Sequence, residues 1–492
     1  MEENPSKKVL IIGAGPVGLT LAIELTRFGI PVQIVEKAAE RTDKSKALVL
    51  WSRTLELLDR QPGGSTTFID AGFKVNALSF LSGDKLVGHV TMDSVATPYP
   101  YALMIPQADT ERILEERLES LGVKVQRSTE ALSLSLHDDG ADVVLRLPDG
   151  REESASAGWV IGCDGAHSLV RHTVGATFDG NTMDSDWILA DVHMRGYPVP
   201  DTEATVHWHQ DGAFVIFPIS PGRYRLLADM PASGEAHPPT PTLEQVQTLI
   251  DRRGTRGMTA FDPFWLAGFR INGRKVTRYR WGRAFLCGDA AHVHSPAGGQ
   301  GMNTGMQDAF NLAWKLALFA KGRAKEALID SFSPERSYVG DQVLKNAERL
   351  TLVGTTKNPV VRTVRDVVGH LMLGLAPVQN RFADTMTGTT IGYPESPLNA
   401  GSASGLEGPE PGQRILGDQP FGAGIEPRFA LLASGGVAAS LIGRYANVLE
   451  AELRSPPDPE GIWLIRPDGY VAAVAKRDDL STIENILARL TT

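Results

Sequence analysis

The residues that first suggest chemistry are three glycines with the spacing of a dinucleotide-binding turn. Gly13, Gly15 and Gly18 lie in the sequence GAGPVG, and glycine at these positions lets the backbone turn tightly and approach a pyrophosphate group. Glu36 follows about 20 positions further on, where an acidic side chain accepts hydrogen bonds from ribose hydroxyls. This spacing predicts a site for the adenosine half of a dinucleotide.

The same stretch also predicts the elements that must position these residues. Apolar residues 9–12 predict a buried strand, residues 17–28 predict a helix, and residues 32–35 predict a second strand that ends at Glu36. A glycine turn between a strand and a helix presents free N–H groups and the positive end of the helix dipole to a phosphate. We therefore predict a Rossmann-like unit in this part of the chain.

A second ligand-binding segment lies far downstream, in residues 283–317. Residues 284–287 predict a buried strand that leads into Gly288 and Asp289, and a glycine-rich loop then opens a helix with apolar residues at helical spacing. The Asp289 carboxylate can accept hydrogen bonds from ribityl hydroxyls, and the helix N-terminus favours a phosphate or an electron-rich ring. Two nucleotide-binding segments so far apart indicate one extended ligand, and we predict FAD.

Composition limits the other functions that the chain can have. Its 492 residues are 42% hydrophobic, enough for several domains with their own cores. A formal net charge of −9, without a basic stripe, argues against a nucleic-acid partner. Two cysteines, Cys163 and Cys287, exclude a disulfide framework, and His207 and His209 lack a third ligand, so we predict no metal site. We expect a cytoplasmic protein with neither signal peptide nor membrane contact, because the first predicted strand begins at once and no apolar run is long enough to span a bilayer.

A third element lies between the two nucleotide-binding segments. Residues 159–171 predict a buried strand, a turn at Asp164 and the start of a helix. The three elements in this order resemble the class A flavoprotein aromatic monooxygenases, the p-hydroxybenzoate hydroxylase family. The resemblance extends from residue 9 to residue 336 and is most specific over residues 292–317. It implies that Asp164 serves both FAD and a transiently bound nicotinamide.

The resemblance implies a reaction as well as a cofactor. In this family NADPH or NADH binds transiently and reduces FAD, and the reduced flavin reacts with O2 to give a C4a-hydroperoxide that hydroxylates an electron-rich ring. Within the family, the chain resembles most the bacterial hydroxylases of phenols and polycyclic aromatic polyketides. The expected partner is therefore a small aromatic molecule, and we expect a monomer or a homodimer.

The same resemblance assigns further residues to the flavin site. Gln107 matches the family's flavin-contacting glutamine. Lys46 stands where the family commonly has arginine, so flavin contact there is expected to be looser or shared with Arg53. Pro296 is expected to shape the loop beside the reacting carbon of the flavin, which makes it the expected catalytic residue. The helix that follows is expected to stabilise negative charge on the reduced flavin. Its expected flavin contacts are Gly299, Gly301, Met302 and Asn303.

The expected fold class is α/β, with a Rossmann-like FAD-binding domain, an inserted β-rich substrate domain and a C-terminal thioredoxin-like α/β domain. The C-terminal domain contains a family signature at residues 466–469 but no Cys-x-x-Cys, so we expect it to pack or oligomerise rather than to do thiol redox chemistry. The expected boundaries are residues 1–180 for the first part of the FAD-binding domain, with a substrate-domain insertion near residues 75–105, residues 181–278 for the substrate-binding sheet, residues 279–395 for the second part of the FAD-binding domain and connecting helices, and residues 396–492 for the C-terminal domain.

The predicted substrate domain reads as a series of hairpins. Residues 181–230 alternate in strand fashion, with turns at residues 211–212 and 221–222. Four residues are candidates to line an apolar pocket for an aromatic substrate, and packing in the core of the sheet is the alternative for each. These are Trp208, Phe214, Phe217 and Pro218.

Several functions remain open on sequence alone. A Baeyer–Villiger or epoxidising enzyme, or one that inactivates an aromatic antibiotic, would use the same cofactor motifs, whereas the lack of a Trp-x-Trp-x-Ile-Pro sequence disfavours a halogenase. A flavin reductase that needs no aromatic ligand and a non-catalytic FAD-binding assembly partner are alternatives from other classes. The sequence identifies no general base. His292 and His294 flank the flavin loop, and we expect them to organise it by hydrogen bonding.

Overall fold

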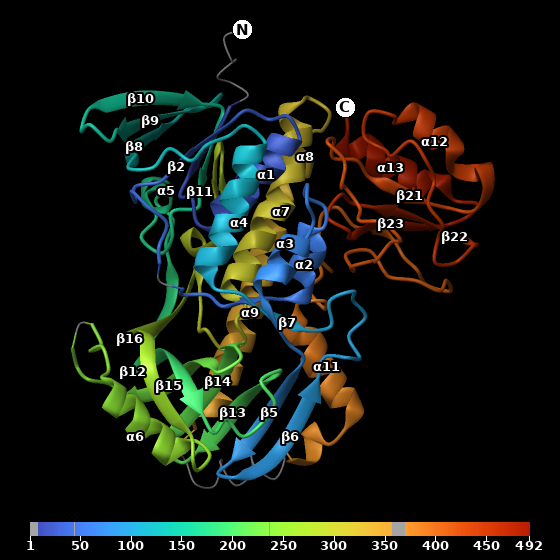
Figure 1. Cartoon of the computed structure of the whole chain (residues 1–492). Helices are drawn as coiled ribbons and strands as arrows, with labels where there is room; N and C mark the ends of the chain where they lie inside the picture. Colours follow the sequence, from blue (N-terminus) through green and yellow to red (C-terminus); the bar gives the residue numbers. More distant parts are fainter. Residues whose placement is uncertain (1–7, 44, 236, 357–369) are drawn as a thin grey trace.

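The computed structural model describes residues 8–43, 45–235, 237–356 and 370–492. Figure 1 shows three bodies: an upper half of helices around a parallel sheet, a large antiparallel sheet below it, and a C-terminal unit, in red, beside the upper half. The long helices of the upper half run between the parallel sheet and the C-terminal unit. The candidate site lies where the upper half meets the antiparallel sheet.

The upper half is built on a five-stranded sheet. Its strands are β1 (Val9–Ile12), β2 (Val32–Val35), β11 (Trp159–Gly162), β17 (Arg280–Trp281) and β18 (Ala284–Leu286). The strand order is β17-β18-β11-β1-β2, and β2, β1, β11 and β18 run parallel. Every residue of β1, β11 and β18 is buried, because a parallel sheet is covered on both faces and its strands are therefore continuously apolar. The predicted strands at residues 9–12 and 32–35 are confirmed.

Helices cover the parallel sheet. The upper half contains α1 (Pro16–Arg27), α2 (Ser52–Leu58), α3 (Thr66–Ala71), α4 (Gln107–Ser120), α5 (Leu169–Thr173), η2 (Gly288–Ala290), α7 (Gly301–Ala320), α8 (Glu326–Asp330) and α9 (Phe332–Thr355), and α11 (Ala376–Thr387) follows. α1 packs against both α4 and α7. α7 is buried along nearly its whole length, and its buried residues include polar and charged side chains such as Asn303, Asp308 and Lys315.

The lower body is an eight-stranded sheet of order β19-β16-β12-β15-β14-β13-β5-β6. Its strands are β5 (Ala77–Ser82), β6 (Lys85–Thr91), β12 (Asp179–Arg195), β13 (Glu203–His209), β14 (Gly212–Ser220), β15 (Arg223–Pro231), β16 (Thr259–Lys275) and β19 (His292–Val293). The two predicted hairpins are confirmed, since β13 pairs with β14 and β14 with β15, both antiparallel. β5 joins the sheet by pairing in parallel with β13.

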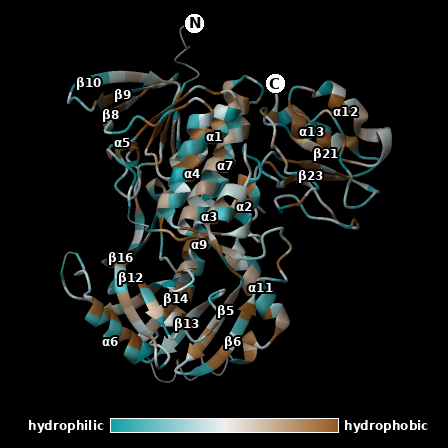
Figure 2. Ribbon diagram, in the orientation of Figure 1, coloured by the Kyte–Doolittle hydropathy of each residue, from teal (hydrophilic) through white to brown (hydrophobic). Residues whose placement is uncertain are grey.

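One face of this sheet carries a helix and the other faces the upper half. α6 (Leu243–Arg253) packs on the sheet, and Figure 2 shows it with alternating hydrophilic and hydrophobic residues. Its buried residues include Val246, Leu249 and Ile250, at the spacing that places side chains on one side of a helix. The opposite face of the sheet is thus left to form a wall of the candidate site.

Two small antiparallel sheets complete the upper half. One contains β8 (Glu130–Leu136), β9 (Ala141–Arg146) and β10 (Glu152–Ala157), and the other contains β3 (Val49–Leu50), β4 (Phe73–Val75) and β7 (Ala102–Met104). β3 immediately follows the segment that includes Lys46, so this sheet helps to fix that segment beside the candidate site.

The C-terminal unit is a separate α/β layer. It contains β20 (Ala400–Gly401), β21 (Ala430–Leu432), β22 (Gly461–Ile465) and β23 (Val471–Lys476), in the order β20-β23-β22-β21, with η3 (Gly435–Ala438), α12 (Ala439–Arg444) and α13 (Leu480–Leu490). β22 is buried throughout and β23 up to its last residue.

The fold class predicted from the sequence is confirmed, with a Rossmann-like half and an inserted β-rich body. Within the described ranges, none of the helices has the length and apolar character needed to cross a bilayer.

Candidate functional site

A cavity of about 880 Å³ lies between the carboxyl ends of the parallel strands and the open face of the eight-stranded sheet. Ligands of parallel α/β sheets bind at this edge, because the strand-to-helix turns meet there. β1, β11 and β18 end at Ile12, Gly162 and Leu286. The three sequence motifs therefore follow three neighbouring strands and converge on one end of the cavity.

The first glycine turn is shaped by close backbone contacts. Gly13 has a φ of +103°, and a Cβ atom there would overlap the main-chain oxygen of Cys163. A Cβ at Gly18 would overlap the main-chain oxygen of Gly13. Gly15, by contrast, lines the cavity and has open space around it. Gly13 and Gly18 thus allow the turn to form, while Gly15 leaves room for a ligand.

The N-terminus of α1 begins at this turn, and Glu36 lies beside it. Pro16 is the first residue of α1, and within the described chain no side chain caps the helix. Its first N–H groups and positive dipole end are therefore available to a phosphate. The Glu36 carboxylate accepts hydrogen bonds from the Ala14 N–H at 2.9 Å and the Ala38 N–H at 3.0 Å. These contacts hold the predicted ribose acceptor next to the predicted pyrophosphate site.

Asp289 presents its carboxylate to the cavity. It lies in η2 directly after β18 and lines the cavity wall. Burial raises the pKa of this carboxyl, and His292 and Lys46 partly oppose the shift. Gly288 before it has a φ of +60° and donates its N–H to Asp308 Oδ2 at 2.9 Å. This contact holds the backbone turn before Asp289, whose carboxylate suits the hydroxyl groups of a ribityl chain.

Asp164 lies near the cavity but does not line it. Its Oδ2 accepts the N–H of Leu169 at 2.7 Å and that of Val170 at 3.3 Å, so it caps α5. Its Oδ1 is buried and lacks a hydrogen-bond partner among the described residues. Burial raises the pKa of this carboxyl. The neighbours Cys163 and Gly165 line the cavity, whereas Asp164 stands just behind them.

The loop before α7 forms another part of the cavity wall. Pro296, Gly299, Gly301 and Met302 line it, and α7 begins there without a side-chain cap among the described residues. The loop passes close to β3, because a Cβ at Gly299 would overlap Val49. The backbone N–H groups at the start of α7 can therefore face a bound ring.

Asn303 holds this loop to β3 rather than lining the cavity. Its Oδ1 accepts the Trp51 N–H at 2.8 Å, and its Nδ2 donates to the main-chain oxygens of Val49 at 2.9 Å and Gly299 at 3.0 Å. The Trp51 indole N–H donates to Gly298 at 2.9 Å. The side chain predicted to contact the flavin thus acts on the shape of the loop.

Lys46 and Gln107 both line the cavity, and Arg53 does not. Gln107 accepts the Ala47 N–H through Oε1 at 3.1 Å. Arg53 is buried, pairs with Glu56 at 3.0 Å and donates to the main-chain oxygen of Asp468. The expectation that Arg53 shares flavin contact with Lys46 is therefore wrong, because its guanidinium points to the C-terminal unit.

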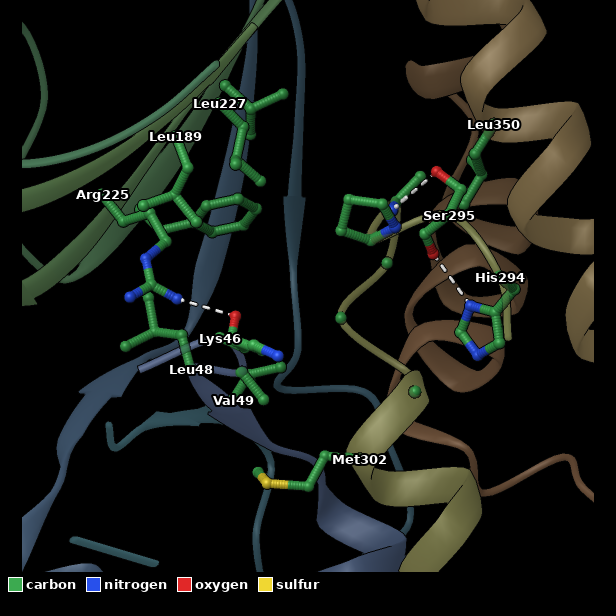
Figure 3. Close-up of a pocket in the computed structure, with 18 of the residues that line it drawn as sticks. Lys46, Leu48, Val49, Leu189, Arg225, Leu227, His294, Ser295, Met302 and Leu350 are labelled. Carbon is green, nitrogen blue, oxygen red and sulfur yellow. Dashed lines mark hydrogen bonds between the residues drawn. The ribbon is translucent and has the colours of Figure 1, made fainter. Parts of the chain in front are cut away.

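The two histidines near the loop organise it, as expected. His292 Nε2 lies 2.8 Å from Asp308 Oδ2, and His294 Nδ1 lies 2.8 Å from the main-chain oxygen of Ser295. Because a carbonyl only accepts, Nδ1 of His294 carries the proton. Burial lowers the pKa of His294 to about 4, so this ring is neutral near pH 7. Figure 3 shows His294 and Ser295 across the cavity from the sheet.

The alternation of side chains along each strand decides which of the predicted substrate-binding residues reach the cavity. Trp208 on β13 and Phe217 on β14 line it. Phe214 is fully buried in the core cluster under α6, and Pro218 pairs with Tyr224 of that same cluster. Successive side chains of a strand point to opposite faces, so residues 214 and 218 cannot share a face with residue 217. The prediction that Phe214 and Pro218 line the pocket is therefore wrong. Both residues pack in the core of the sheet, which was the alternative for each.

Several cavity residues escaped the sequence reasoning. β12 and β15 contribute side chains from the same face as β13 and β14, and Phe80 and Trp265 add aromatic rings. The additional wall residues from these strands are Trp187, Leu189, Arg225 and Leu227. The alternation of side chains along β12 and β15 divides these residues between the two faces of the sheet. It does not reveal which of the two faces is covered by α6.

Arg225 joins the sheet to the cofactor side of the cavity. Its Nε and Nη2 donate to the two Asp191 oxygens at 2.7 and 2.8 Å, and its Nη1 donates to the main-chain oxygen of Lys46 at 3.1 Å. Figure 3 shows this contact beside Leu189 and Leu227. Both charged side chains are almost completely buried. The pair fixes the spacing between the substrate sheet and the segment around Lys46.

His207 and His209 do not form part of a metal centre in the described chain, where no group of three potential metal ligands occurs. His207 is buried and packs on Phe214 at 5.6 Å between ring centroids.

Comparison with known proteins defines the class. The sequence matches the family described as "FAD binding domain" over residues 6–347. The chain belongs to this family, and its fold and relatives define it as a class A flavoprotein aromatic monooxygenase.

Particular relatives cover the chain almost end to end. It is 35% identical over 522 aligned residues to 6-methylpretetramide 4-monooxygenase of Streptomyces rimosus, an alignment that covers 98% of this chain and 93% of that protein. It resembles the solved structure of an anhydrotetracycline hydroxylase from Streptomyces rimosus with a TM-score of 0.80, 28% identity and 98% coverage of both chains. It also resembles a Diels-Alderase of pyrroindomycin biosynthesis, with a TM-score of 0.78, 28% identity and 99% coverage of both chains.

Proposed function

We propose that this protein is an FAD-dependent, NAD(P)H-consuming monooxygenase that hydroxylates a phenolic or polycyclic aromatic compound. The observation that carries the proposal is the continuity of one cavity. It runs from the glycine turn and Asp289, through the loop before α7, to the aromatic face of the eight-stranded sheet. A cofactor and an aromatic substrate would therefore share one continuous space.

The residues at the cofactor end fit FAD. The turn at Gly15 and the start of α1 would hold the pyrophosphate, and Glu36 the adenosine ribose. Asp289 would accept hydrogen bonds from the ribityl chain. The N-terminus of α7 would hold the flavin ring, with Pro296 beside it, because its positive dipole end favours negative charge. When bound, FAD would supply the transfer of electrons from NADPH or NADH to O2.

The chain's own residues would position the substrate and exclude water. Trp208, Phe217, Trp187 and Trp265 form broad apolar surfaces, which suit a planar ring. Arg225 would keep these strands at a fixed distance from Lys46. Two S. rimosus proteins that resemble this chain are named as a 6-methylpretetramide 4-monooxygenase and an anhydrotetracycline hydroxylase, which supports a polycyclic aromatic substrate.

Oxygen incorporation tests the proposal. Purified holoenzyme, NADPH or NADH, and a panel of phenols and polycyclic aromatic polyketides would be incubated under ¹⁸O2, and the products analysed by mass spectrometry. One labelled oxygen atom in a hydroxyl group is the expected result. A labelled lactone or epoxide would instead assign the Baeyer–Villiger or epoxidising alternative, and an inactivated antibiotic would show a detoxifying role.

A second candidate is an FAD-binding protein that does not oxidise its substrate. The observation in its favour is the similarity to the Diels-Alderase, which covers nearly the whole chain. In that case the flavin would not be reduced by NADPH or NADH with any ligand, and no labelled oxygen would enter a product.

A further inference from the structure

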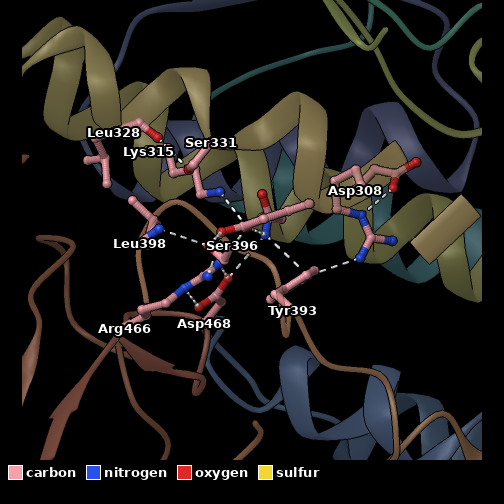
Figure 4. A network of polar contacts seen from close by, with 12 residues as sticks. Asp308, Lys315, Leu328, Ser331, Tyr393, Ser396, Leu398, Arg466 and Asp468 are labelled. Carbon is pink, nitrogen blue, oxygen red and sulfur yellow. Dashed lines mark hydrogen bonds and ion pairs between the residues drawn. The ribbon is translucent and has the colours of Figure 1, made fainter. Parts of the chain in front are cut away.

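A buried network of charged residues joins the C-terminal unit to the upper half. Arg466, directly after β22, donates to both carboxylate oxygens of Glu335 on α9 at 2.8 and 3.0 Å. It also donates to both oxygens of Asp468 at 2.9 and 2.6 Å. Lys315 of α7 donates to Glu335 at 2.6 Å. Figure 4 shows Arg466 and Asp468 reaching from the C-terminal unit toward α7.

A second ion pair lies next to the flavin motif. Asp308 of α7 accepts the Arg336 Nε–H at 2.6 Å, the Gly288 N–H at 2.9 Å and a hydrogen bond from His292 Nε2 at 2.8 Å. The side chains of Asp308 and Arg336 are fully buried. Asp308 therefore fixes the backbone immediately before Asp289.

Tyr393 connects the two ion clusters. Its hydroxyl accepts hydrogen bonds from Arg336 Nη1 at 3.0 Å and from Asn311 Nδ2 at 3.2 Å. Asn311 also donates to Glu335 at 2.8 Å, and the Arg466 guanidinium lies 4.9 Å from the centre of the Tyr393 ring. Figure 4 shows Tyr393 between Asp308 and the Arg466–Asp468 pair. A continuous path of contacts thus leads from the C-terminal unit to the flavin motif.

The path consists of balanced, buried charges. Three cations and three anions, each at most 2% exposed, take part. They are Lys315, Arg336, Arg466, Asp308, Glu335 and Asp468. Burial alone would raise the pKa of Glu335, but Arg466 and Lys315 lower it to about 2, so this carboxylate is ionised near pH 7. Because a buried ion that loses its partner is left uncompensated, each member constrains the position of the next.

We propose that Asp308 is a positioning residue for the flavin and that the C-terminal unit sets its position through Arg466 and Tyr393. The inference rests on the proposed role of Asp289 in holding FAD. Because Asp308 holds the Gly288 N–H, movement of its carboxylate moves the Asp289 turn. The C-terminal unit, which has no Cys-x-x-Cys, thereby becomes part of the cofactor-binding machinery without touching the cavity.

The test uses Tyr393→Phe, which removes only the hydroxyl group that joins the two ion clusters. The dissociation constant of FAD would be measured by flavin fluorescence on refilled apoprotein, well below the melting temperature of each variant. We expect FAD binding to weaken by roughly three- to tenfold, the scale of one or two lost hydrogen bonds. The flavin absorption spectrum should also change in shape, because its surroundings shift.

Glu426→Gln is the matched control at the same interface. Glu426 joins the C-terminal unit to Lys321, at 2.9 Å, and to Arg323. Within the described chain it forms no hydrogen bond or ion pair with Asp308 or Tyr393. We expect its FAD affinity and flavin spectrum to equal those of the wild type. Equal weakening in Glu426→Gln and Tyr393→Phe would overturn the inference, because any loosening of the interface would then suffice.

A double-mutant cycle shows whether Tyr393 acts through Asp308. Asp308→Asn alone should weaken FAD binding by roughly a hundredfold, because it leaves Arg336 buried without its full counter-charge. If Tyr393 acts through Asp308, adding Tyr393→Phe should weaken binding little further. If the fold changes in FAD dissociation constant of the two single variants simply multiply in the double variant, the two residues act independently, which would contradict the proposed path. A lower melting temperature of Tyr393→Phe with unchanged FAD affinity would also overturn it.

Asp289→Ala separates this inference from the proposed function. Loss of FAD from Asp289→Ala together with unchanged binding by Tyr393→Phe would overturn the inference alone. Full retention of FAD by Asp289→Ala would overturn the assignment of Asp289 on which both rest.

Discussion

Arg225 of the substrate sheet donates a hydrogen bond to the main-chain oxygen of Lys46 at 3.1 Å. The contact crosses from the sheet that faces the substrate to the segment that faces the cofactor. Asp191 holds the other side of the guanidinium through two hydrogen bonds. One buried ion pair therefore links the two walls of the cavity.

Asp191→Asn should be strongly destabilising. The substitution leaves Arg225 buried without its counter-charge, which costs about 3–5 kcal/mol in other proteins. Urea unfolding measures the change in the free energy of unfolding. Asp262→Asn is the control, because its pair with His193 is largely exposed and should contribute less than about 1 kcal/mol. Similar losses in both variants would argue against a special role of the Arg225 pair.

Two glycines of the first turn should respond differently to alanine. Gly13→Ala should destabilise the fold by about 2 kcal/mol or more, because the residue has a positive φ and its Cβ would overlap Cys163. Gly15→Ala should leave the free energy of unfolding within about 1 kcal/mol, since nothing lies near its Cβ. It should nevertheless weaken FAD binding. Thermal unfolding of the apoprotein and FAD titration separate the two effects, and normal FAD binding by Gly15→Ala would refute the pyrophosphate assignment.

Glu36→Gln should weaken the hold on the adenosine end of FAD. The amide keeps the size of the side chain but accepts weaker hydrogen bonds than a carboxylate, so we expect a roughly tenfold increase in the dissociation constant. Retention of FAD during dialysis measures it. Glu40→Gln, at an exposed position nearby, should behave like the wild type. Unchanged retention by Glu36→Gln would refute the ribose assignment.

Phe214 and Phe217 should have opposite roles although they are three positions apart on β14. Phe214→Ala should cost about 3–5 kcal/mol of stability, because the ring is fully buried under α6. Phe217→Ala should cost less and should instead change the stimulation of NAD(P)H oxidation by aromatic ligands, since Phe217 lines the cavity. The reverse pattern would show that the substrate faces the α6 side of the sheet.

His207 should make stability depend on pH between its unfolded and folded pKa values. Burial lowers its pKa to about 4 from an ordinary value of about 6.5. Above about pH 6.5 both states are neutral, and as the pH falls toward 4 only the unfolded state gains a proton. The free energy of unfolding should therefore fall over this range, by about 3 kcal/mol from this residue. The free energy of unfolding of His207→Gln should fall less steeply with pH than that of the wild type. Identical slopes for the two proteins would contradict the prediction.

The sequence predicted best those features that local geometry determines. The strand, glycine turn and helix at residues 9–28 are marked by an apolar run and glycine spacing within one short stretch, so their order was sufficient to predict the cofactor motif. The assignments of Phe214 and Pro218 depended on which face of the sheet α6 covers, and alternation alone does not reveal it. Arg53 could not be placed, because its partner Asp468 lies more than 400 positions away in the C-terminal unit.

The rate of flavin reduction without oxygen tests the proposed reaction most directly. Holoenzyme would be mixed with NADPH or NADH in a stopped-flow instrument, with and without each member of a panel of phenols and polycyclic aromatic compounds. We predict slow reduction without ligand and strong stimulation by one class of aromatic compound, which would identify the substrate class. Fast reduction that is independent of every ligand would indicate a flavin reductase instead, and no reduction under any condition would contradict redox catalysis altogether.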